Sequence, residues 1–179
     1  IRDGAVADIA IQAALTGHLV FSTLHTNDAP SAITRLIDMG VKPFLVASSI
    51  QAIMAQRLLR VICKNCKVVD ENPDPHYLRL LDITPDDVKK NPVYKGKGCS
   101  KCQGTGFKGR LGIFEMVEMN SEIRELAFSK ATTTELRKAA IAGGMRTLML
   151  DGKIKIFKGI TTPREVAEIA QSEEAEAHS

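Results

Sequence analysis

The spacing of apolar residues at the start of the chain predicts a helix followed by a strand. Apolar side chains at positions 6, 9, 10, 13 and 14 fall on one helical face, and Gly17 is expected to end that helix. Residues 18–25 carry apolar side chains at both odd and even positions. This pattern is typical of a strand buried on both faces of a parallel sheet.

Two further helices are expected before the first cysteine. Helical spacing covers positions 29–37, after a turn and helix cap at 26–28, and Gly40 stops it. Pro43 is expected to open a longer helix that reaches Arg60. Helix, strand and helix at these lengths predict part of a layered α/β domain.

The remainder of the chain divides into an irregular middle and a helical end. Prolines and glycines interrupt any periodicity over 63–110, and residues 111–118 then have the composition of a strand. Two Thr-x-x-Glu sequences, 132–135 and 162–165, fit capping boxes that begin short helices. The acidic tail 172–179 is expected to fray.

Composition changes this picture only in the middle segment. The 179 residues are 44% hydrophobic and 25% charged, which is ordinary for a globular protein, and the net charge of +3 does not by itself predict a nucleic-acid partner. Residues 63–110 hold 10 basic and 6 acidic residues and all four cysteines. We therefore expect three parts: 1–62, a distinct module at 63–110, and 111–179.

The beginning of the chain has no export or membrane signal. The longest uncharged run, 9–27, contains a glycine, two histidines and several other polar residues, which a membrane span does not tolerate. The chain starts at Ile1 and enters a helical pattern at once, without a signal peptide. We expect a soluble piece of a longer protein.

The cysteines form two C-x-x-C pairs with 32 residues between them, and their spacing predicts a four-thiolate zinc site. Two disulfides, unpaired core thiols and a thioredoxin-type redox pair are the alternatives, and the first is weakened by the lack of a secretory signal. A site with four cysteine ligands and no open position is usually structural. The predicted ligands are Cys63, Cys66, Cys99 and Cys102.

The basic residues around the cysteines allow a second hypothesis. Lys64, Lys67 and Lys101 can offset the double negative charge of a four-thiolate site. The same module could instead be a zinc ribbon that binds nucleic acid or a protein partner. Only three aromatic residues lie in the segment, which is few for stacking bases, so nucleic acid is not expected. A weaker similarity, to the zinc repeats of DnaJ-type chaperones, would require more cysteines than the chain has.

Two histidines flank the predicted strand at its ends. His18 and His25 are an odd number of positions apart, so they are expected to point to opposite faces and not to share a metal. Ser22, Thr23 and His25 lie toward the carboxyl end of the strand, where open α/β sheets bind ligands, and could hydrogen-bond a phosphate. Alternatively His25 and Asn27 only cap the following helix.

These segments together resemble one known family. The ordered series is 1–3 (Ile-Arg-Asp), 15–29 around the two histidines, 56–60 (Gln-Arg-Leu-Leu-Arg), the two cysteine pairs and 109–115 (Gly-Arg-Leu-Gly-Ile-Phe-Glu). It resembles the C-terminal part of the type II secretion and type IV pilus assembly ATPases. The cysteine pairs resemble the tetracysteine zinc motif of the assembly and secretion motors, which the retraction motors lack.

The resemblance implies the following expectations. The fold class would be α/β, the C-terminal part of a RecA-like P-loop ATPase core with a zinc-binding insertion and a helical C-terminal bundle. The full protein would form a homohexamer at the cytoplasmic face of the inner membrane, use ATP and Mg²⁺, and act on an inner-membrane platform protein. His25 and His18 would sense the γ-phosphate, and Arg2, Asp3, Ser22 and Thr23 would lie at the nucleotide.

The chain departs from the family pattern at its catalytic parts. It contains no G-x-x-x-x-G-K-[ST] sequence, so it has no loop of backbone amides and lysine to hold the phosphates of ATP. The family's acidic box and the Gly-Glu that precedes Ile-Arg-Asp would lie upstream of Ile1. We therefore predict that this piece alone does not hydrolyse ATP.

Overall fold

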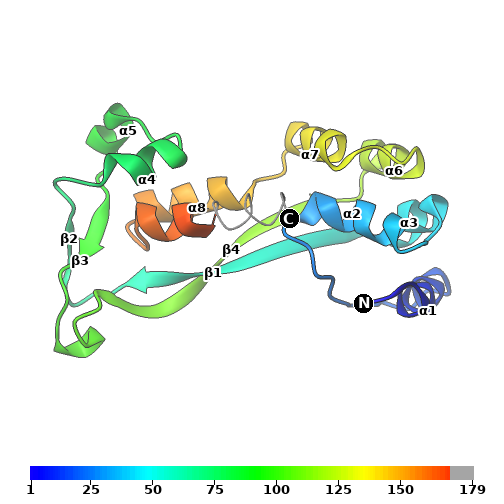
Figure 1. Cartoon of the computed structure of the whole chain (residues 1–179), viewed down its shortest axis with the longest axis horizontal. Coiled ribbons are helices and arrows are strands. Elements are labelled where there is room, and N and C mark those ends of the chain that lie inside the picture. The colour runs from blue at the N-terminus through cyan, green and yellow to red at the C-terminus, as the bar shows by residue number, and fades with distance from the viewer. Residues whose placement is uncertain (170–179) are drawn as a thin grey trace. The chain divides into compact units, whose positions relative to one another are not determined.

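The computed structural model describes residues 1–169 (Figure 1). Its helices are α1 (Gly4–Leu15), α2 (Ala29–Asp38), α3 (Pro43–Ser49), α4 (Pro75–Leu80), α5 (Pro85–Lys90), α6 (Ser121–Phe128), α7 (Thr133–Ala142) and α8 (Leu148–Phe157). Its strands are β1 (Ala52–Ile62), β2 (Lys67–Val69), β3 (Tyr94–Gly96) and β4 (Phe107–Glu118), with a 3₁₀ turn, η1, at Ser100–Cys102. Residues 163–169 are helical, and the acidic tail lies outside the described residues.

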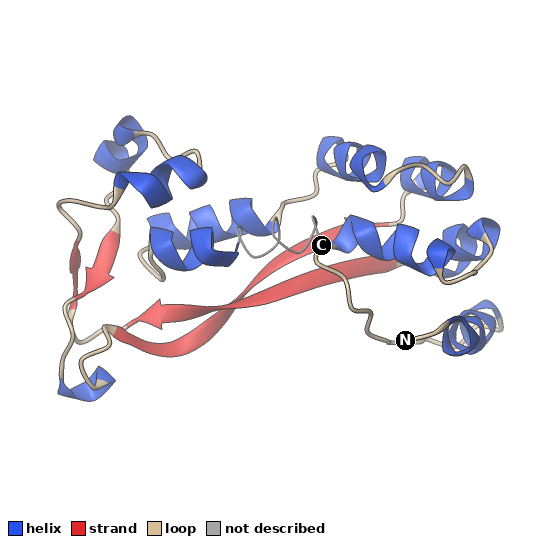
Figure 2. Ribbon diagram, in the orientation of Figure 1, coloured by secondary structure: helices blue, strands red, loops and turns tan. Residues whose placement is uncertain are grey.

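The chain folds into two compact units, and each is built from two separate stretches of sequence. The first comprises 1–55 and 115–147, and the second comprises 56–114 together with the chain from Leu148 onward. Strands β1 and β4 are hydrogen-bonded neighbours (Figure 2), and each contains residues of both units. They run antiparallel, because Met119 N–H donates to the Gln51 carbonyl at 3.0 Å and Cys63 N–H donates to the Gly106 carbonyl at 2.9 Å.

The first unit is a group of helices around the end of β4. Helix α3 packs against α6 and α1, and α2 packs against α7. The side chains at these contacts are aliphatic and fully buried, which suits a chain with few aromatic residues. They include Ala7, Ile33, Val46, Val117, Ile123 and Leu136.

The second unit joins the far end of β1 to a small irregular subdomain and to α8. Strands β2 and β3 pair antiparallel, with Lys67 opposite Gly96 and Val69 opposite Tyr94. Helices α4 and α5 follow β2, and Leu81 and Val93 are completely buried there. Leu59, Ile62, Ile113 and Ile156 form a further buried set from β1, β4 and α8.

Several predicted elements are confirmed, and the structure shows which side chains start them. Helices α1 and α2 begin at the side chains of Asp3 and Asp28, which accept hydrogen bonds from Val6 N–H at 2.9 Å and Ser31 N–H at 2.7 Å. Thr132 and Glu135 form the predicted capping box of α7. The expected strand at 111–118 is longer, starting at Phe107.

The long helix expected after Pro43 is wrong beyond Ser49. Helix α3 ends at Ser49, and Ala52–Ile62 form β1 instead. Ala55, Leu59 and Ile62 are the buried residues of β1, and their spacing suits one face of a helix equally well. Hydrogen bonding to β4, which lies far away in the sequence, selects the strand.

The strand expected at 18–25 is also not formed. These residues have no strand assignment, and Leu19 and Phe21 are 81% and 87% exposed. A strand requires a neighbouring strand to accept its hydrogen bonds, and no strand of residues 1–169 pairs with this segment. The apolar pattern is thus present without the expected sheet around it.

No helix within residues 1–169 combines the length and the apolar character that a bilayer crossing requires.

Candidate functional site

The four cysteines come together at the tip of the second unit. Their sulfur atoms all lie within 4.8 Å of one another, and Cys63 and Cys102 are buried. Cys63 follows β1, Cys66 precedes β2, Cys99 precedes η1 and Cys102 is the last residue of η1. The Sγ–Sγ distance is 3.9 Å for Cys63–Cys99 and for Cys66–Cys102, and 3.7 Å for Cys99–Cys102, so all four thiols are free. This cluster could hold a metal ion, as the spacing predicts.

Backbone N–H groups support the sulfur of Cys102. Cys99 N–H donates to it at 3.2 Å and Gly106 N–H at 3.3 Å. Burial raises the pKa of the Cys102 thiol, but these donors and the neighbouring thiols outweigh it and lower that pKa to about 6. Burial, together with the other three thiols, raises the pKa of Cys66 to about 12. The two backbone N–H donors therefore stabilise negative charge on the Cys102 sulfur.

Two glycines let the loops around the cysteines approach closely. Gly106 has φ +77°, and a Cβ there would lie 2.6 Å from the carbonyl oxygen of Gly96. Gly98 has φ +89°, and a Cβ there would lie 2.6 Å from the carbonyl oxygen of Gly104. Both positions exclude a side chain by backbone conformation and by space.

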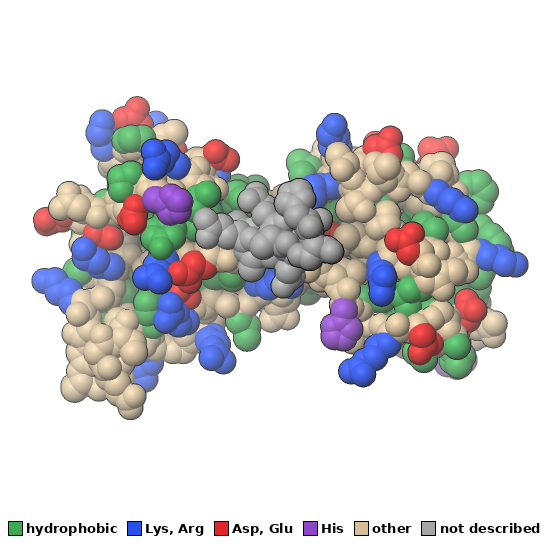
Figure 3. Space-filling view, in the orientation of Figure 1, with side chains coloured by type: hydrophobic (Ala, Val, Ile, Leu, Met, Phe, Trp, Pro, Cys, Tyr) green, Lys and Arg blue, Asp and Glu red, His purple; other side chains and the backbone are tan. Residues whose placement is uncertain are grey.

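Three lysines of the middle segment, Lys67, Lys89 and Lys95, have partners within their own unit. The ammonium of Lys67 lies 4.2 Å from the centre of the Tyr94 ring, and Lys95 forms an ion pair with Asp70 at 2.7 Å. On the face drawn in Figure 3, basic and acidic side chains are interspersed over this unit. A continuous basic surface, which binding to nucleic acid would favour, is not seen on that face.

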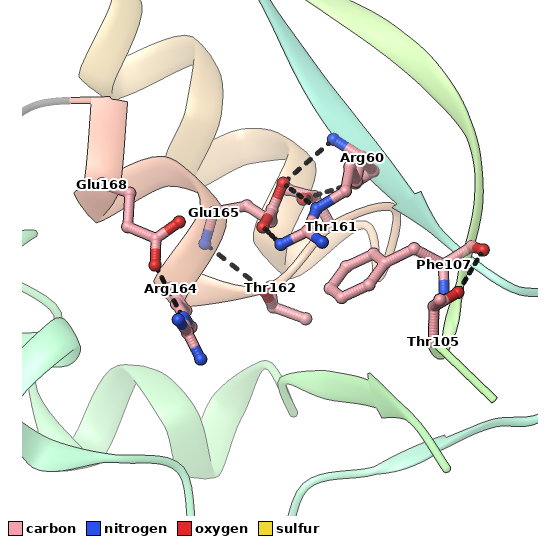
Figure 4. Close-up of polar contacts among 8 residues, drawn as sticks. All are labelled: Arg60, Thr105, Phe107, Thr161, Thr162, Arg164, Glu165 and Glu168. Carbon is pink, nitrogen blue, oxygen red and sulfur yellow. Dashed lines mark hydrogen bonds and ion pairs between the residues drawn. The ribbon is translucent and has the colours of Figure 1, made fainter. Parts of the chain in front are cut away.

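A charged cluster that sequence analysis did not predict lies near the end of β1 (Figure 4). Arg60 donates its backbone N–H to Glu165 Oε2 at 3.2 Å and its Nε to the same oxygen at 3.0 Å, and its Nη2 pairs with the other oxygen. The guanidinium also lies 4.5 Å from the centre of the Phe107 ring. Hydrogen bonding to Glu165 raises the pKa of Arg60 above its ordinary value.

This cluster corrects one expectation about the second capping box. Thr162 Oγ1 does accept the N–H of Glu165, at 3.4 Å, as that motif requires. The carboxylate of Glu165, however, binds Arg60 and is 8% exposed. The Thr161 hydroxyl, which is fully buried, donates to the Arg60 carbonyl at 2.9 Å, so the turn at 160–165 is fixed to the end of β1 from both sides.

The residues expected at a nucleotide lie in the first unit but do not all share one surface. His18, Ser22 and Thr23 line a cavity of about 480 Å³ whose other walls are mostly apolar. His18 Nδ1 lies 3.1 Å from the Thr16 hydroxyl. His25 is exposed and does not line this cavity. The structure thus brings three of the six predicted residues together.

Arg2 and Asp3 are placed by the start of the chain. The amino group of Ile1 donates to the Thr23 carbonyl at 2.6 Å, which sets 1–3 beside 22–23. The Asp3 carboxylate caps α1, and the Arg2 side chain is exposed. Asp3 therefore already has a structural role.

A second acidic residue that sequence analysis did not single out, Glu115, contacts the start of α2, which follows the histidine segment. Glu115, in the 109–115 motif, is 2% exposed and accepts the N–H of Ala29 at 3.1 Å. The carboxylate of Asp28 pairs with Arg137 of α7, and Arg137 Nη1 lies 4.0 Å from Glu115 Oε2. The sequence signal for this residue was an acidic side chain within a predicted strand. Its partners could not be predicted, because Ala29 and Arg137 lie 86 and 22 positions away in the sequence.

Comparison with known proteins places this chain in a family. The family model described as type II/IV secretion system protein matches residues 1–168. The chain is 47% identical to the type IV pilus assembly ATPase PilB of Thermus thermophilus over 93% of its length, and 44% identical to the type II secretion system protein E of Pectobacterium carotovorum over 97%. The chain belongs to the type II/IV secretion system protein family.

Solved structures share the fold. The ATPase DotB of Yersinia pseudotuberculosis matches 96% of this chain with a TM-score of 0.62 at 19% identity, and the match covers 35% of the DotB chain. The pilus retraction motor PilT, solved with ADP, matches 94% of this chain with a TM-score of 0.60 at 23% identity, over 37% of its own length. The chain spans 19% of the Thermus relative and 34% of the Pectobacterium relative. The fold is therefore the α/β fold of secretion and pilus ATPases, represented here by part of its length.

Proposed function

We propose that this chain is the C-terminal part of an ATP-hydrolysing motor that drives type IV pilus assembly or type II protein secretion. The observation that carries the proposal is identity of 40–47% to assembly and secretion proteins over nearly the whole chain. The matched stretches cover 93–97% of this chain. Relatives from both systems match about equally well, so the proposal covers both.

In this proposal the first unit supplies part of the nucleotide site of the longer protein. His25 and His18 contact or sense the γ-phosphate of ATP bound with Mg²⁺, and Arg2, Asp3, Ser22 and Thr23 lie near it. The support is chemical: imidazole and hydroxyl groups donate hydrogen bonds to phosphate oxygens, and His25 is exposed three residues before Asp28, the N-cap of α2. The phosphate-binding loop and catalytic acid come from the part of the protein upstream of Ile1.

The test is ATP turnover of the longer protein that contains this chain. Replacing His25 by alanine is expected to lower turnover about 100-fold, as loss of a group that stabilises transition-state charge does. His76→Ala is the matched control, because His76 lies in the other unit, on α4. Residues 1–179 alone are expected to release no phosphate from ATP. Unchanged turnover in His25→Ala would contradict the proposed γ-phosphate role and leave His25 with a structural role in the turn before α2.

We further propose that the four cysteines bind a structural Zn²⁺ ion. Four thiolates in a tetrahedron around zinc, each with a bond of about 2.3 Å, have sulfur–sulfur distances of about 3.8 Å. Three sulfur–sulfur distances, of 3.7–3.9 Å, agree with that arrangement, and all four sulfurs lie within 4.8 Å of one another. Zinc supplies no chemistry to ATP here: it crosslinks the end of β1 and the start of β2 to the loop around η1.

Gly106 gives a sharp test of this zinc site. Gly106→Ala is expected to lower zinc affinity about 10- to 100-fold, because the new Cβ would collide with the Gly96 carbonyl and force residue 106 to move, and with it the residue-106 N–H that supports Cys102. Gly109→Ala is the matched control, since Gly109 has a similar φ of +86° but open space around its Cβ. Competition with a chromophoric zinc chelator measures both variants. Equal affinities in the two variants would contradict the close-approach argument.

The assembly and location follow from the same proposal. The longer protein works as a homohexamer at the cytoplasmic face of the inner membrane, and its partner is the platform protein of the pilus or secretion machine. No nucleic-acid partner is proposed, since Lys67 and Lys95 contact Tyr94 and Asp70, and basic and acidic side chains are interspersed on the face drawn in Figure 3.

A further inference from the structure

A cluster of three charged residues holds the segment that follows His25. Asp28 is the N-cap of α2, and its Oδ1 accepts the Ser31 N–H at 2.7 Å while its other oxygen pairs with Arg137. Glu115 Oε1 accepts the N–H of Ala29, the first residue of α2, at 3.1 Å. Glu115 of β4 therefore contacts Ala29, and Arg137 of α7 contacts Asp28, although both lie more than 80 positions away in the sequence.

This arrangement exceeds what capping α2 requires. One carboxylate at the N-cap is enough to start a helix, and Asp28 provides it. Burying a second carboxylate costs free energy unless it is both hydrogen-bonded and paired. Glu115 is almost completely buried, and the Ala29 N–H and the Arg137 guanidinium at 4.0 Å provide those two interactions. The second acid fixes where the helix begins relative to β4.

The turn itself depends on the same anchor. The Thr26 hydroxyl donates to the Asp28 carbonyl at 3.1 Å, so the backbone between His25 and α2 is tied to the residue that Arg137 holds. A further bond of 3.0 Å joins the Thr34 and Thr133 hydroxyls, which keeps α2 and α7 in register one turn further along. His25 is therefore three residues from a point fixed by β4 and α7.

We propose that Glu115 and Arg137 are positioning residues that fix the orientation of His25 by anchoring Asp28 and Ala29. This inference rests on the phosphate-sensing role proposed above for His25, and extends it to residues of β4 and α7. Neither side chain needs to contact the nucleotide. Arg137 connects the two carboxylates, so its loss releases Asp28 and removes the guanidinium that lies between Asp28 and Glu115.

The experiment uses the full-length protein with Arg137→Ala, Arg137→Lys and the control Lys138→Ala. Lys138 is the next residue on α7 and is exposed, so it matches the loss of one cation. Hydrogen exchange of the Ala29 and Ser31 amides is expected to rise about 10-fold or more in Arg137→Ala, and less in Arg137→Lys, which keeps a charge. Exchange equal to that of Lys138→Ala would overturn the proposal. The lysine variant covers the case in which Arg137→Ala does not fold.

Kinetics provide a readout that a merely structural role would not change. Arg137→Ala is expected to lower kcat about 10-fold with little change in KM for ATP, and the double variant with His25→Ala is expected to be no slower than His25→Ala alone. Single effects that multiply in the double variant would overturn the proposal.

The two proposals fail in different ways. Slow turnover in His25→Ala, with normal turnover and exchange in Arg137→Ala, overturns the positioning role and leaves the proposed function standing. Normal turnover in His25→Ala overturns the role given to His25 and therefore its positioning by Arg137, while amide exchange still reports whether Arg137 holds the turn.

Discussion

Replacing Cys99 by serine is expected to abolish metal binding, from about one Zn²⁺ per chain to none, and to open the loops around the four-cysteine cluster. A hydroxyl is a far weaker zinc ligand than a thiolate, and the remaining three sulfurs cannot close the site. Metal content by elemental analysis measures the first effect. The control is Ser100→Ala, one residue along the same turn and exposed.

The structural effect of this substitution is expected to stay local. The Lys97 N–H to Cys66 carbonyl bond of 3.0 Å and the Gly104 N–H to Cys99 carbonyl bond of 3.0 Å hold the loops together, and their amides should exchange much faster without the metal. Ile83 N–H, bonded to the Leu78 carbonyl at 2.9 Å, lies in the α4–α5 region with its own buried residues and should be unaffected. Unchanged metal content in Cys99→Ser would show that the four-thiolate site is wrong.

Sequence patterns predicted what depends on neighbouring residues. Helix α2 begins at Asp28 and ends before Gly40 because capping and glycine conformation act within a few residues. The four cysteines were recognised for a similar reason, since each pair is a single tight turn. The parts assigned as 1–62, 63–110 and 111–179 remain predictions, as do the nucleotide roles of His18, His25, Arg2, Asp3, Ser22 and Thr23.

Features set by distant residues were missed. Ala55, Leu59 and Ile62 have a spacing that both a helix and a strand can bury, and only the pairing of β1 with β4 decides between them. Glu165 fits a local capping box, yet its carboxylate binds Arg60, 105 positions earlier in the chain. Similar side chains with local partners, such as Glu135, follow the motif.

Glu165→Ala is expected to destabilise the second unit by about 2–4 kcal/mol. This is less than the loss expected for a fully buried ion pair, because the Arg60 side chain is half exposed and solvent screens its charge. The substitution removes the acceptor of the Arg60 backbone N–H and the partner of its guanidinium. It also frees the turn that pairs with β1, where Ile62 N–H donates to the Ile160 carbonyl at 2.8 Å. Exchange of the Ile62 amide measures the free energy of this local opening.

Glu168→Ala is the matched control for this prediction. Glu168 lies on the same helical segment and pairs with Arg164 at 2.6 Å, but both side chains of that pair are well exposed. Its removal should cost less than about 0.5 kcal/mol, the usual value for a surface pair four residues apart. Glu165→Gln should fall between the two, because the amide oxygen still accepts the Arg60 N–H but carries no charge. Equal opening free energies in Glu165→Ala and Glu168→Ala would mean that the Arg60 cluster does not hold the 160–165 turn to β1.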